Sequence, residues 1–347
     1  MALPQIEVIL QKIGMAPGVA PPRLKPRFPA VAVCVVPGKV GAIRLGGPAA
    51  RRKGEPARVS VAAHAEAALP PGAVAPSLAR GNLMETAPVQ QAIREVLLQV
   101  APREDRVSLV LPDSVARVSI LKFNRMPATR REVVELIRFR MQKVLPFRIE
   151  EAALDYQLLS DAGSGEPDFL VTLAQRPVLF QYERLLTGLD RQAGLVDLES
   201  FNLVNLVARF PEKASLDQGD WAMVNAAPGY LTVLFFRQGA LCFYRCKAMS
   251  DEERAADSHG AAVRRELASC AAYYREHLAG KALASAYVKS SNGEGKILPG
   301  LVREELGCEV RIVDPGKVVT LPAGSDPEDS RWQTLAAAIG AAMGRRP

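Results

Sequence analysis

The residues of this chain that could carry chemistry are few, and they do not form a known catalytic pattern. Its five cysteines and three histidines are scattered, without the Cys-x-x-Cys spacing of a zinc site. The cysteines lie mostly in apolar, strand-like runs, so we interpret them as small buried thiols in a reducing compartment. The sequence has no P-loop, no Gly-x-Gly-x-x-Gly and no Gly-x-Ser-x-Gly, the motifs that position phosphates or a nucleophilic serine. We therefore expect neither a catalytic centre nor a metal site.

Three glycine-containing turns are the best candidates for contacts with a phosphate group. The first, Pro37-Gly38-Lys39, follows an apolar strand-like run, and the second, Ala227-Pro228-Gly229, lies between two such runs. The third is the polar loop Ser290-Ser-Asn-Gly-Glu-Gly295. Glycine allows backbone N–H groups to approach a phosphate closely. The first turn is better explained as a plain hairpin connection, although Gly38 or Lys39 near a phosphate stays an alternative.

Length, composition and charge indicate a globular protein of two lobes. The chain has 347 residues, 48% of them hydrophobic, and its apolar runs are shorter than the ~20 residues that a membrane-spanning helix needs. Its beginning does not resemble a signal peptide, so we expect a cytoplasmic protein. The net charge of +7 comes without any nucleic-acid-binding motif, so we expect no nucleic-acid partner. The densest cations are Arg130, Arg131, Arg138, Arg140, Lys143 and Arg148. They predict a solvated helix face or contact with a membrane-anchored partner.

Hydrophobic periodicity predicts strand hairpins followed by helices, twice over. The expected strands are residues 31–36, 41–45, 57–62, 107–111, 118–123, 152–159, 168–174, 194–198, 221–226, 230–236, 240–246, 285–289 and 309–313. The expected helices are residues 88–100, 129–144, 177–192, 200–210 and 251–279, one beginning near 298, and 327–343. The pattern fits an α/β protein of two lobes without selecting one fold.

The stretch from residue 109 to 174 contains the most specific sequence motifs. It opens with Leu109-Val-Leu-Pro-Asp-Ser114, and its amphipathic helix is ended by Leu145-Pro-Phe147. A strand containing Asp155-Tyr-Gln157 follows. These motifs, in the order strand, helix, strand, strand, resemble those of the type IV pilus assembly protein PilM family in the actin-like, FtsA-like superfamily. The resemblance covers most of residues 31–344, and it is weaker at the glycine turns.

The resemblance implies an α/β fold of two ribonuclease H-like, actin-fold lobes with an inserted strand-helix-strand-strand (SHS2-type) subdomain. The implied organisation is a tail over 1–30, a first lobe over 31–117 continued by 176–210, an insert over 118–175 and a second lobe over 216–347 that ends in a helix.

The resemblance also implies where a nucleotide would bind. Relatives carry aspartate and glycine where this chain has Cys34 and Val36, and again where it has Asn225 and Ala227. Magnesium needs carboxylate oxygens, and a neutral thiol is a poor ligand for so hard a cation. The vestigial nucleotide-site candidates are Gly38, Lys39, Asn225, Gly229, Thr232 and Gly293. We therefore expect a degenerate site without a cofactor, with ATP and magnesium as the alternative.

In function, the resemblance implies a cytoplasmic scaffold, peripheral to the inner membrane, in type IV pilus or related secretion assembly. Its implied partner is the cytoplasmic tail of a PilN-like inner-membrane protein, held between the first lobe and the insert, beside other pilus assembly proteins. The alternative is an active, ATP-binding FtsA-like actin homologue in cell division or filament formation. A third reading is the cytoplasmic part of a type II secretion protein of similar fold.

Overall fold

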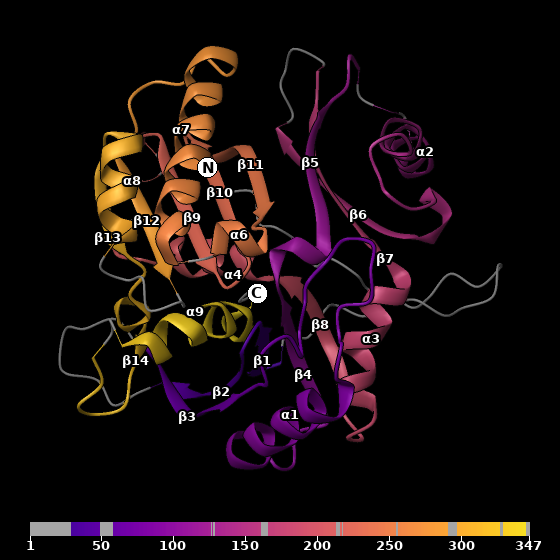
Figure 1. The fold of residues 1–347 in the computed structure, drawn as a ribbon, viewed down its shortest axis with the longest axis vertical. Helices are drawn as coiled ribbons and strands as arrows, with labels where there is room; N and C mark the ends of the chain where they lie inside the picture. Colours follow the sequence, from indigo (N-terminus) through magenta and orange to yellow (C-terminus); the bar gives the residue numbers. More distant parts are fainter. Residues whose placement is uncertain are drawn as a thin grey trace.

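The protein is built on three β-sheets. The computed structural model describes residues 29–48, 58–125, 127, 129–160, 166–212, 216, 218–254, 256–290, 297–326 and 329–344. The predicted tail over 1–30 lies outside this part except for its last two residues. A five-stranded and a three-stranded sheet stand side by side above a six-stranded sheet (Figure 1). None of the described helices is both long and apolar enough to cross a membrane.

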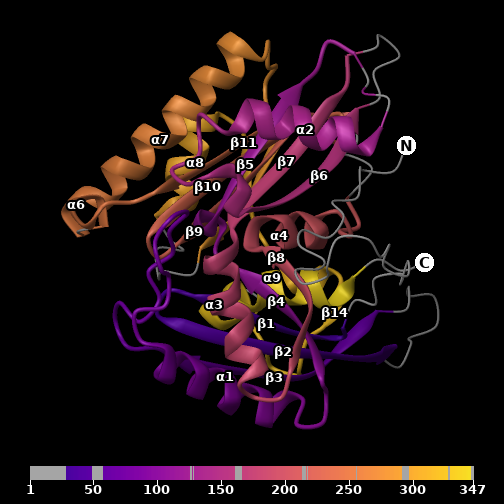
Figure 2. The ribbon, with the colours of Figure 1, turned by 90° about the vertical axis from the view of Figure 1, so that its right-hand side faces the viewer.

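The six-stranded sheet has the order β14-β3-β2-β1-β4-β8. Its strands are β1 (Val31–Val36), β2 (Lys39–Pro48), β3 (Val59–Ala68), β4 (Arg106–Leu111), β8 (Gln192–Leu198) and β14 (Val319–Thr320). Every residue of β1 is buried, because this strand lies between antiparallel β2 and parallel β4. A central strand covered on both faces is typically a continuous apolar run, as Val-Ala-Val-Cys-Val-Val is. Helices α1 (Thr86–Val100) and α3 (Arg176–Thr187) pack beside this sheet (Figure 2).

The five-stranded sheet has the order β11-β10-β9-β12-β13. Its strands are β9 (Trp221–Ala227), β10 (Tyr230–Arg237), β11 (Ala240–Ala248), β12 (Ser285–Ser290) and β13 (Glu309–Ile312). Helices α6 (Asp251–Arg254), α7 (Ala256–His277) and α8 (Leu298–Leu306) accompany it. Gly307 ends α8 in the left-handed conformation, with φ of 65°, which glycine adopts without steric cost.

The three-stranded sheet has the order β5-β7-β6 and carries α2. Its elements are β5 (Ala116–Lys122), α2 (Arg130–Met141), β6 (Ala152–Ser160) and β7 (Asp168–Gln175). The hydroxyl of Thr129 caps α2 by accepting a hydrogen bond of 3.1 Å from the backbone N–H of Glu132. The predicted order of strand, helix, strand and strand is present in this sheet.

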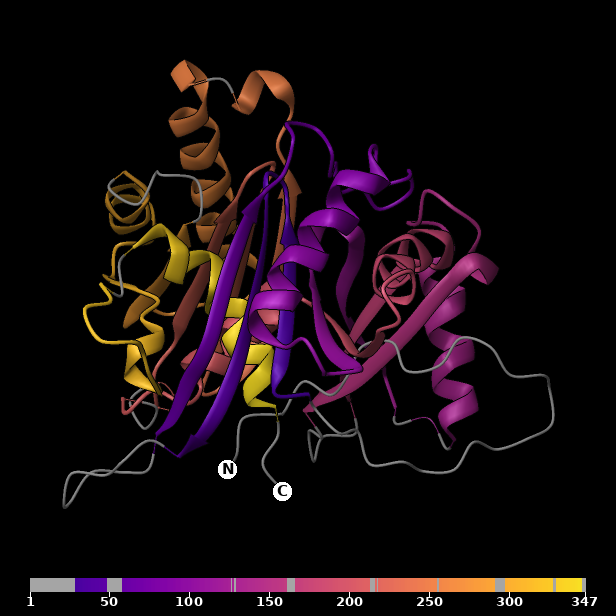
Figure 3. The ribbon, with the colours of Figure 1, turned by 90° about the horizontal axis from the view of Figure 1, so that it is seen from below.

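The end of the chain departs from the expected division. We assigned residues 216–347 to the second lobe, yet β14 pairs with β3 of the six-stranded sheet. Helix α9 (Ser330–Met343) packs on β1, β2 and β4 of that sheet and on α4 (Glu199–Val207). It lies on the face opposite α1 (Figures 1 and 3). The reason is burial, since residues 332–342 are buried around most of the helix and need cover on several sides.

Candidate functional site

Two of the predicted glycine turns are hairpin turns in the structure. Gly38 joins β1 to β2 with φ of 83°, and Gly229 joins β9 to β10 with φ of 93°. Both values lie in the left-handed region, where a side chain would be strained. Their carbonyl oxygens accept backbone hydrogen bonds from Leu69 (2.9 Å) and Met249 (2.8 Å). Lys39 is the first residue of β2 and is partly exposed.

Asn225 and Thr232 of the predicted set are neighbours in the second sheet. They are paired in register on β9 and β10, and both are fully buried. Gly293, the last predicted residue, lies outside the described residues.

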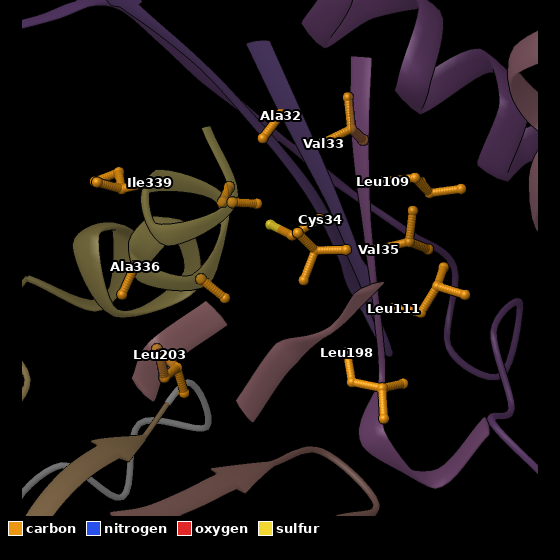
Figure 4. Close-up of a cluster of buried hydrophobic side chains, with 14 of the residues drawn as sticks. Ala32, Val33, Cys34, Val35, Leu109, Leu111, Leu198, Leu203, Ala336 and Ile339 are labelled. Carbon is orange, nitrogen blue, oxygen red and sulfur yellow. The ribbon is translucent and has the colours of Figure 1, made fainter. Parts of the chain in front are cut away.

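The thiol of Cys34 faces protein rather than a cleft. Its Sγ lies 3.5 Å from the carbonyl oxygens of Gly41 and of Thr334 on α9, and the residue is not exposed. The side chain lies among apolar residues between β1 and α9 (Figure 4). Burial, with the nearby charge of Glu199, raises the pKa of this thiol to about 12. Cys34 is therefore a neutral packing residue.

A buried polar cluster joins the first and second sheets, and we name it the interlobe cluster: Asp113, Glu199, Ser200, Asn225, Tyr230 and Lys289. Parallel strands β4 and β8 deliver its first-sheet members, since Asp113 follows β4 and Glu199 follows β8. Ligand sites in α/β sheets lie characteristically at such carboxyl ends. Asn225, Tyr230 and Lys289 come from the second sheet, where β9 and β12 hold Asn225 beside Lys289.

Glu199 is the centre of the interlobe cluster. Its Oε1 lies 2.6 Å from Nζ of Lys289, and neither side chain is exposed. Its Oε2 accepts hydrogen bonds from the hydroxyl of Tyr230 and from Nδ2 of Asn225, the latter at 3.0 Å. The carboxylate thus receives three donors, all from the second sheet. Burial acts to raise the pKa of Glu199, but Lys289 and these hydrogen bonds outweigh it and lower the pKa.

Asp113 and Ser200 complete the cluster on the side of the first sheet. The backbone N–H of Ser200 donates to Oδ1 of Asp113 at 2.9 Å, and the Ser200 hydroxyl donates to Oδ2. Nδ2 of Asn225 reaches the same Oδ2 at 3.3 Å. Burial and the charge of Glu199 raise the pKa of Asp113 to about 6, and hydrogen bonds from Ser200 and Thr232 partly oppose this.

The chemistry open to this cluster is ion pairing rather than catalysis. The hydroxyl of Ser200 donates its hydrogen bond to Asp113, and no histidine among the cluster's residues is present to activate it as a nucleophile. Across the described residues, no group of three or more His, Cys, Asp or Glu side chains is arranged to hold a metal ion. The positive charge beside Glu199 is supplied by Lys289 of the protein itself.

Sequence reasoning missed five of the six members of the cluster: Asp113, Glu199, Ser200, Tyr230 and Lys289. One signal was available, because Lys289 is the only charged residue of β12, whose six positions are all buried. Buried lysines are almost always paired, so this pattern predicts a carboxylate partner. It does not say which one, since Glu199 lies 90 positions away.

Comparisons with known proteins establish the fold. No protein-family model matches the chain, and no curated protein matches its sequence significantly. A chain of the PilM–PilN type IV pilus biogenesis complex superposes with a TM-score of 0.74 at 18% identity, over 92% of this chain and 98% of that chain. The cytoplasmic domain of EpsL, an inner membrane component of the type II secretion system of Vibrio cholerae, gives 0.44 at 10% identity, over 91% and 95%. A Bacteroides thetaiotaomicron protein with an actin-like ATPase fold gives 0.45 at 9% identity, over 83% and 91%.

The likeness to the PilM–PilN complex is close enough to show a common fold, while the identity is too low to show more. The predicted fold class is therefore confirmed: the chain has an α/β, actin-like fold.

Proposed function

We propose that this chain is an actin-fold scaffold of type IV pilus or related secretion assembly, which holds the cytoplasmic tail of a PilN-like inner-membrane protein. The observation that carries the proposal is the match to a chain of the PilM–PilN complex over almost the full length of both chains.

The proposal includes a nucleotide site that has lost its function. Magnesium bound to a nucleotide requires free carboxylate oxygens. The thiol of Cys34 packs against α9. The carboxylate of Glu199 is paired with Lys289 and accepts hydrogen bonds from Tyr230 and Asn225. The described residues of the interlobe cluster do not fit a magnesium ion, because Lys289 neutralises Glu199 and the oxygens of Asp113 already accept hydrogen bonds from Ser200 and Asn225. In this proposal the ion pair replaces the nucleotide as the connection between the lobes.

For the tail, we propose a site at the junction of the first lobe and the three-stranded sheet. Extended peptides bind through backbone hydrogen bonds and apolar pockets. Helix α3 connects β7 to the first lobe and packs on both, and its Phe180 is 38% exposed. A large apolar side chain left open at this junction supports a role as an anchor for the tail.

The charge on α2 supports a position near the membrane. Phe139 on this helix is 70% exposed and has Arg138 and Arg140 as sequence neighbours. Each well-placed cation near an anionic membrane surface contributes about 1 kcal/mol of attraction. A scaffold that holds a short membrane-proximal tail would gain from this contact.

Co-purification tests the tail-binding proposal. The full chain should be recovered with its PilN-like partner and lost when the partner's cytoplasmic tail is deleted. A partner reduced to its tail and membrane segment is the positive control and should still be recovered. Unchanged recovery after deletion of the tail would reject tail capture.

Two variants locate the site. Phe180→Glu should weaken recovery of the partner. The control is Leu98→Glu, which places the same charge on another exposed apolar residue (60%), on α1 of the same lobe, and should leave recovery unchanged. Equal effects of both changes would mean that the tail does not bind at the junction at α3.

A further inference from the structure

A groove lies between β5 of the three-stranded sheet and the second lobe. Its volume is about 750 Å³, and its walls are β5, β11 and α7. The two strands run beside each other in Figure 1. The groove is separate from the interlobe cluster, none of whose residues lines it. Nor does it include α3, so it is distinct from the proposed tail site.

The groove follows the unpaired edges of two sheets, which contact each other over part of their length. β5 is an edge strand of the three-stranded sheet, and β11 is an edge strand of the five-stranded sheet. The lining includes six consecutive residues of β11, from 242 to 247, and three of β5, from 116 to 118. Successive side chains of a strand point to opposite faces, so a groove that touches consecutive residues follows the edge of the strand. Such an edge presents backbone N–H and C=O groups that a further strand can pair with.

The charge of the lining is one-sided. It contains the cations Arg117, Lys122, Arg245 and Lys247, and none of its residues is acidic. Carboxylates behind the lining compensate two of them: Glu266 pairs with Arg245, and Glu253 pairs with Lys247 at 2.8 Å.

The two cations on β5 are left uncompensated. Arg117 and Lys122 are exposed, and in the part of the chain that the structure describes neither side chain forms an ion pair. The surplus positive charge of the groove therefore lies along the open edge of β5.

The groove also has neutral lining residues. Cys242 and Cys246 line it, and burial raises the pKa of the Cys242 thiol to about 11 and moves that of Cys246 in the same direction. Val118, Ile120 and Phe243 add apolar surface. An occupant would therefore meet apolar surface as well as the positive charge along β5.

We propose that the groove binds an acidic, extended peptide segment of a partner protein, which adds a strand to the open edge of β5. Backbone hydrogen bonds to β5 supply affinity, and carboxylate side chains of the peptide pair with Arg117 and Lys122. The binding does not depend on the proposed capture of a PilN-like tail. A partner that occupies this groove contacts the insert and the second lobe together.

The first test is a binding titration on the full chain. The probes are fluorescent octapeptides with Glu at two positions five residues apart, matching the spacing of Arg117 and Lys122, and Val, Thr or Tyr elsewhere. They are compared with the same peptides carrying Lys in place of Glu. We expect saturable, micromolar binding of at least one acidic probe and none of the basic probes. A backbone N-methylated copy of the bound probe keeps its charge but cannot pair with a strand edge, so it should lose binding.

Charge reversal at the groove has a matched control. The double variant Arg117→Glu with Lys122→Glu should weaken binding at least about tenfold. The control is Arg44→Glu with Arg94→Glu, which changes the net charge equally at two exposed cations outside the groove. Circular dichroism verifies that both double variants are folded.

Hydrogen exchange provides a readout that charge attraction alone would not move. With the acidic probe bound, exchange should slow in residues 116–122. It should not slow in β6 or β13, the opposite edges of the two sheets.

Four outcomes of these experiments overturn the proposal, and a fifth assigns the groove to another occupant. They are absence of saturable binding below about 1 mM, equal binding of the N-methylated probe, equal loss in the control variant, and protection of β6 or β13 in place of β5. If instead the chain forms a dimer in sedimentation that Lys122→Glu dissociates, the groove takes a second copy of the chain and the acidic-peptide proposal is wrong.

Discussion

Nζ of Lys289 lies 2.6 Å from Oε1 of Glu199, and neither side chain reaches solvent. The two residues belong to different lobes, so the ion pair joins the C-terminal part of β12 to the first turn of α4. Charges withdrawn from water are tolerated only when their partners compensate them. The connection between the lobes therefore depends on both residues being present.

The first prediction follows from that dependence. Lys289→Met keeps the length of the side chain but leaves Glu199 as an unpaired buried charge, and it should lower the free energy of unfolding by about 3–5 kcal/mol. Adding Glu199→Gln should restore part of the loss, because the uncompensated charge is removed. Denaturant unfolding of the single and double variants measures both effects.

An exposed ion pair supplies the control for this experiment. Arg131 and Glu135 on α2 are 2.8 Å apart, with 88% and 60% of their side chains exposed. Arg131→Met should change the free energy of unfolding by less than about 1 kcal/mol. A loss below 1 kcal/mol for Lys289→Met as well would contradict the role given to the buried pair.

The second prediction concerns Asp197, which is buried at the end of β8. Burial raises its pKa from 3.8 to about 7, although the backbone N–H of Leu198 and the side chain of Asn202 oppose the rise. The folded state then binds the proton more tightly than the unfolded state, so stability falls as pH rises from about 4 to about 7. A difference of about three pKa units corresponds to at most about 4 kcal/mol.

Asp197→Asn isolates this effect, since it keeps an acceptor oxygen and removes the titration. Relative to the unchanged protein, the variant should be more stable at pH 8 than at pH 4, as measured by denaturant unfolding at both values. A difference between variant and unchanged protein that is the same at pH 4 and pH 8 would show that Asp197 does not titrate as described.

The third prediction is weak or absent ATP binding. By its resemblance to the PilM family, the chain is expected to have Asn225 and Cys34 where relatives carry aspartates, and Nδ2 of Asn225 already donates to Glu199 at 3.0 Å. Calorimetry with magnesium and ATP at about millimolar concentration should give no saturable heat. Micromolar affinity that disappears in Asn225→Ala would reject the degenerate site and favour the FtsA-like alternative.

Local structure was largely predictable from the sequence, and the reasons differ between elements. The uniformly apolar run of β1 predicts a strand that is covered on both faces. The capping residue Thr129 indicates the start of α2. The predicted helix over 177–192 ends earlier, at Thr187, because the chain turns there and Asp190 takes a left-handed φ of 56°.

The interlobe cluster was largely beyond prediction. Its members span positions 113 to 289, and apart from Lys289 each looks ordinary among its sequence neighbours. Only the chain's path through two sheets brings them together, and periodicity describes single elements. The position of α9 on the first sheet was missed for the same reason, since its apolar residues do not say which surface they cover.

The last prediction concerns the crossing of α4 and α9. A Cβ added at Gly340 would lie 2.0 Å from the backbone carbonyl oxygen of Asn202, so no larger residue fits without moving one helix. Gly340→Ala should therefore lower the free energy of unfolding by about 1–3 kcal/mol or more, despite the better helix propensity of alanine. Gly300→Ala in α8 is the matched control, because a Cβ there meets nothing within 4 Å. It should stabilise the protein by about 0.5–1 kcal/mol. Denaturant unfolding of both variants decides the matter: a Gly340→Ala variant that is as stable as the unchanged protein, or more stable, would mean that the helices do not cross as closely as Gly340 and Asn202 indicate.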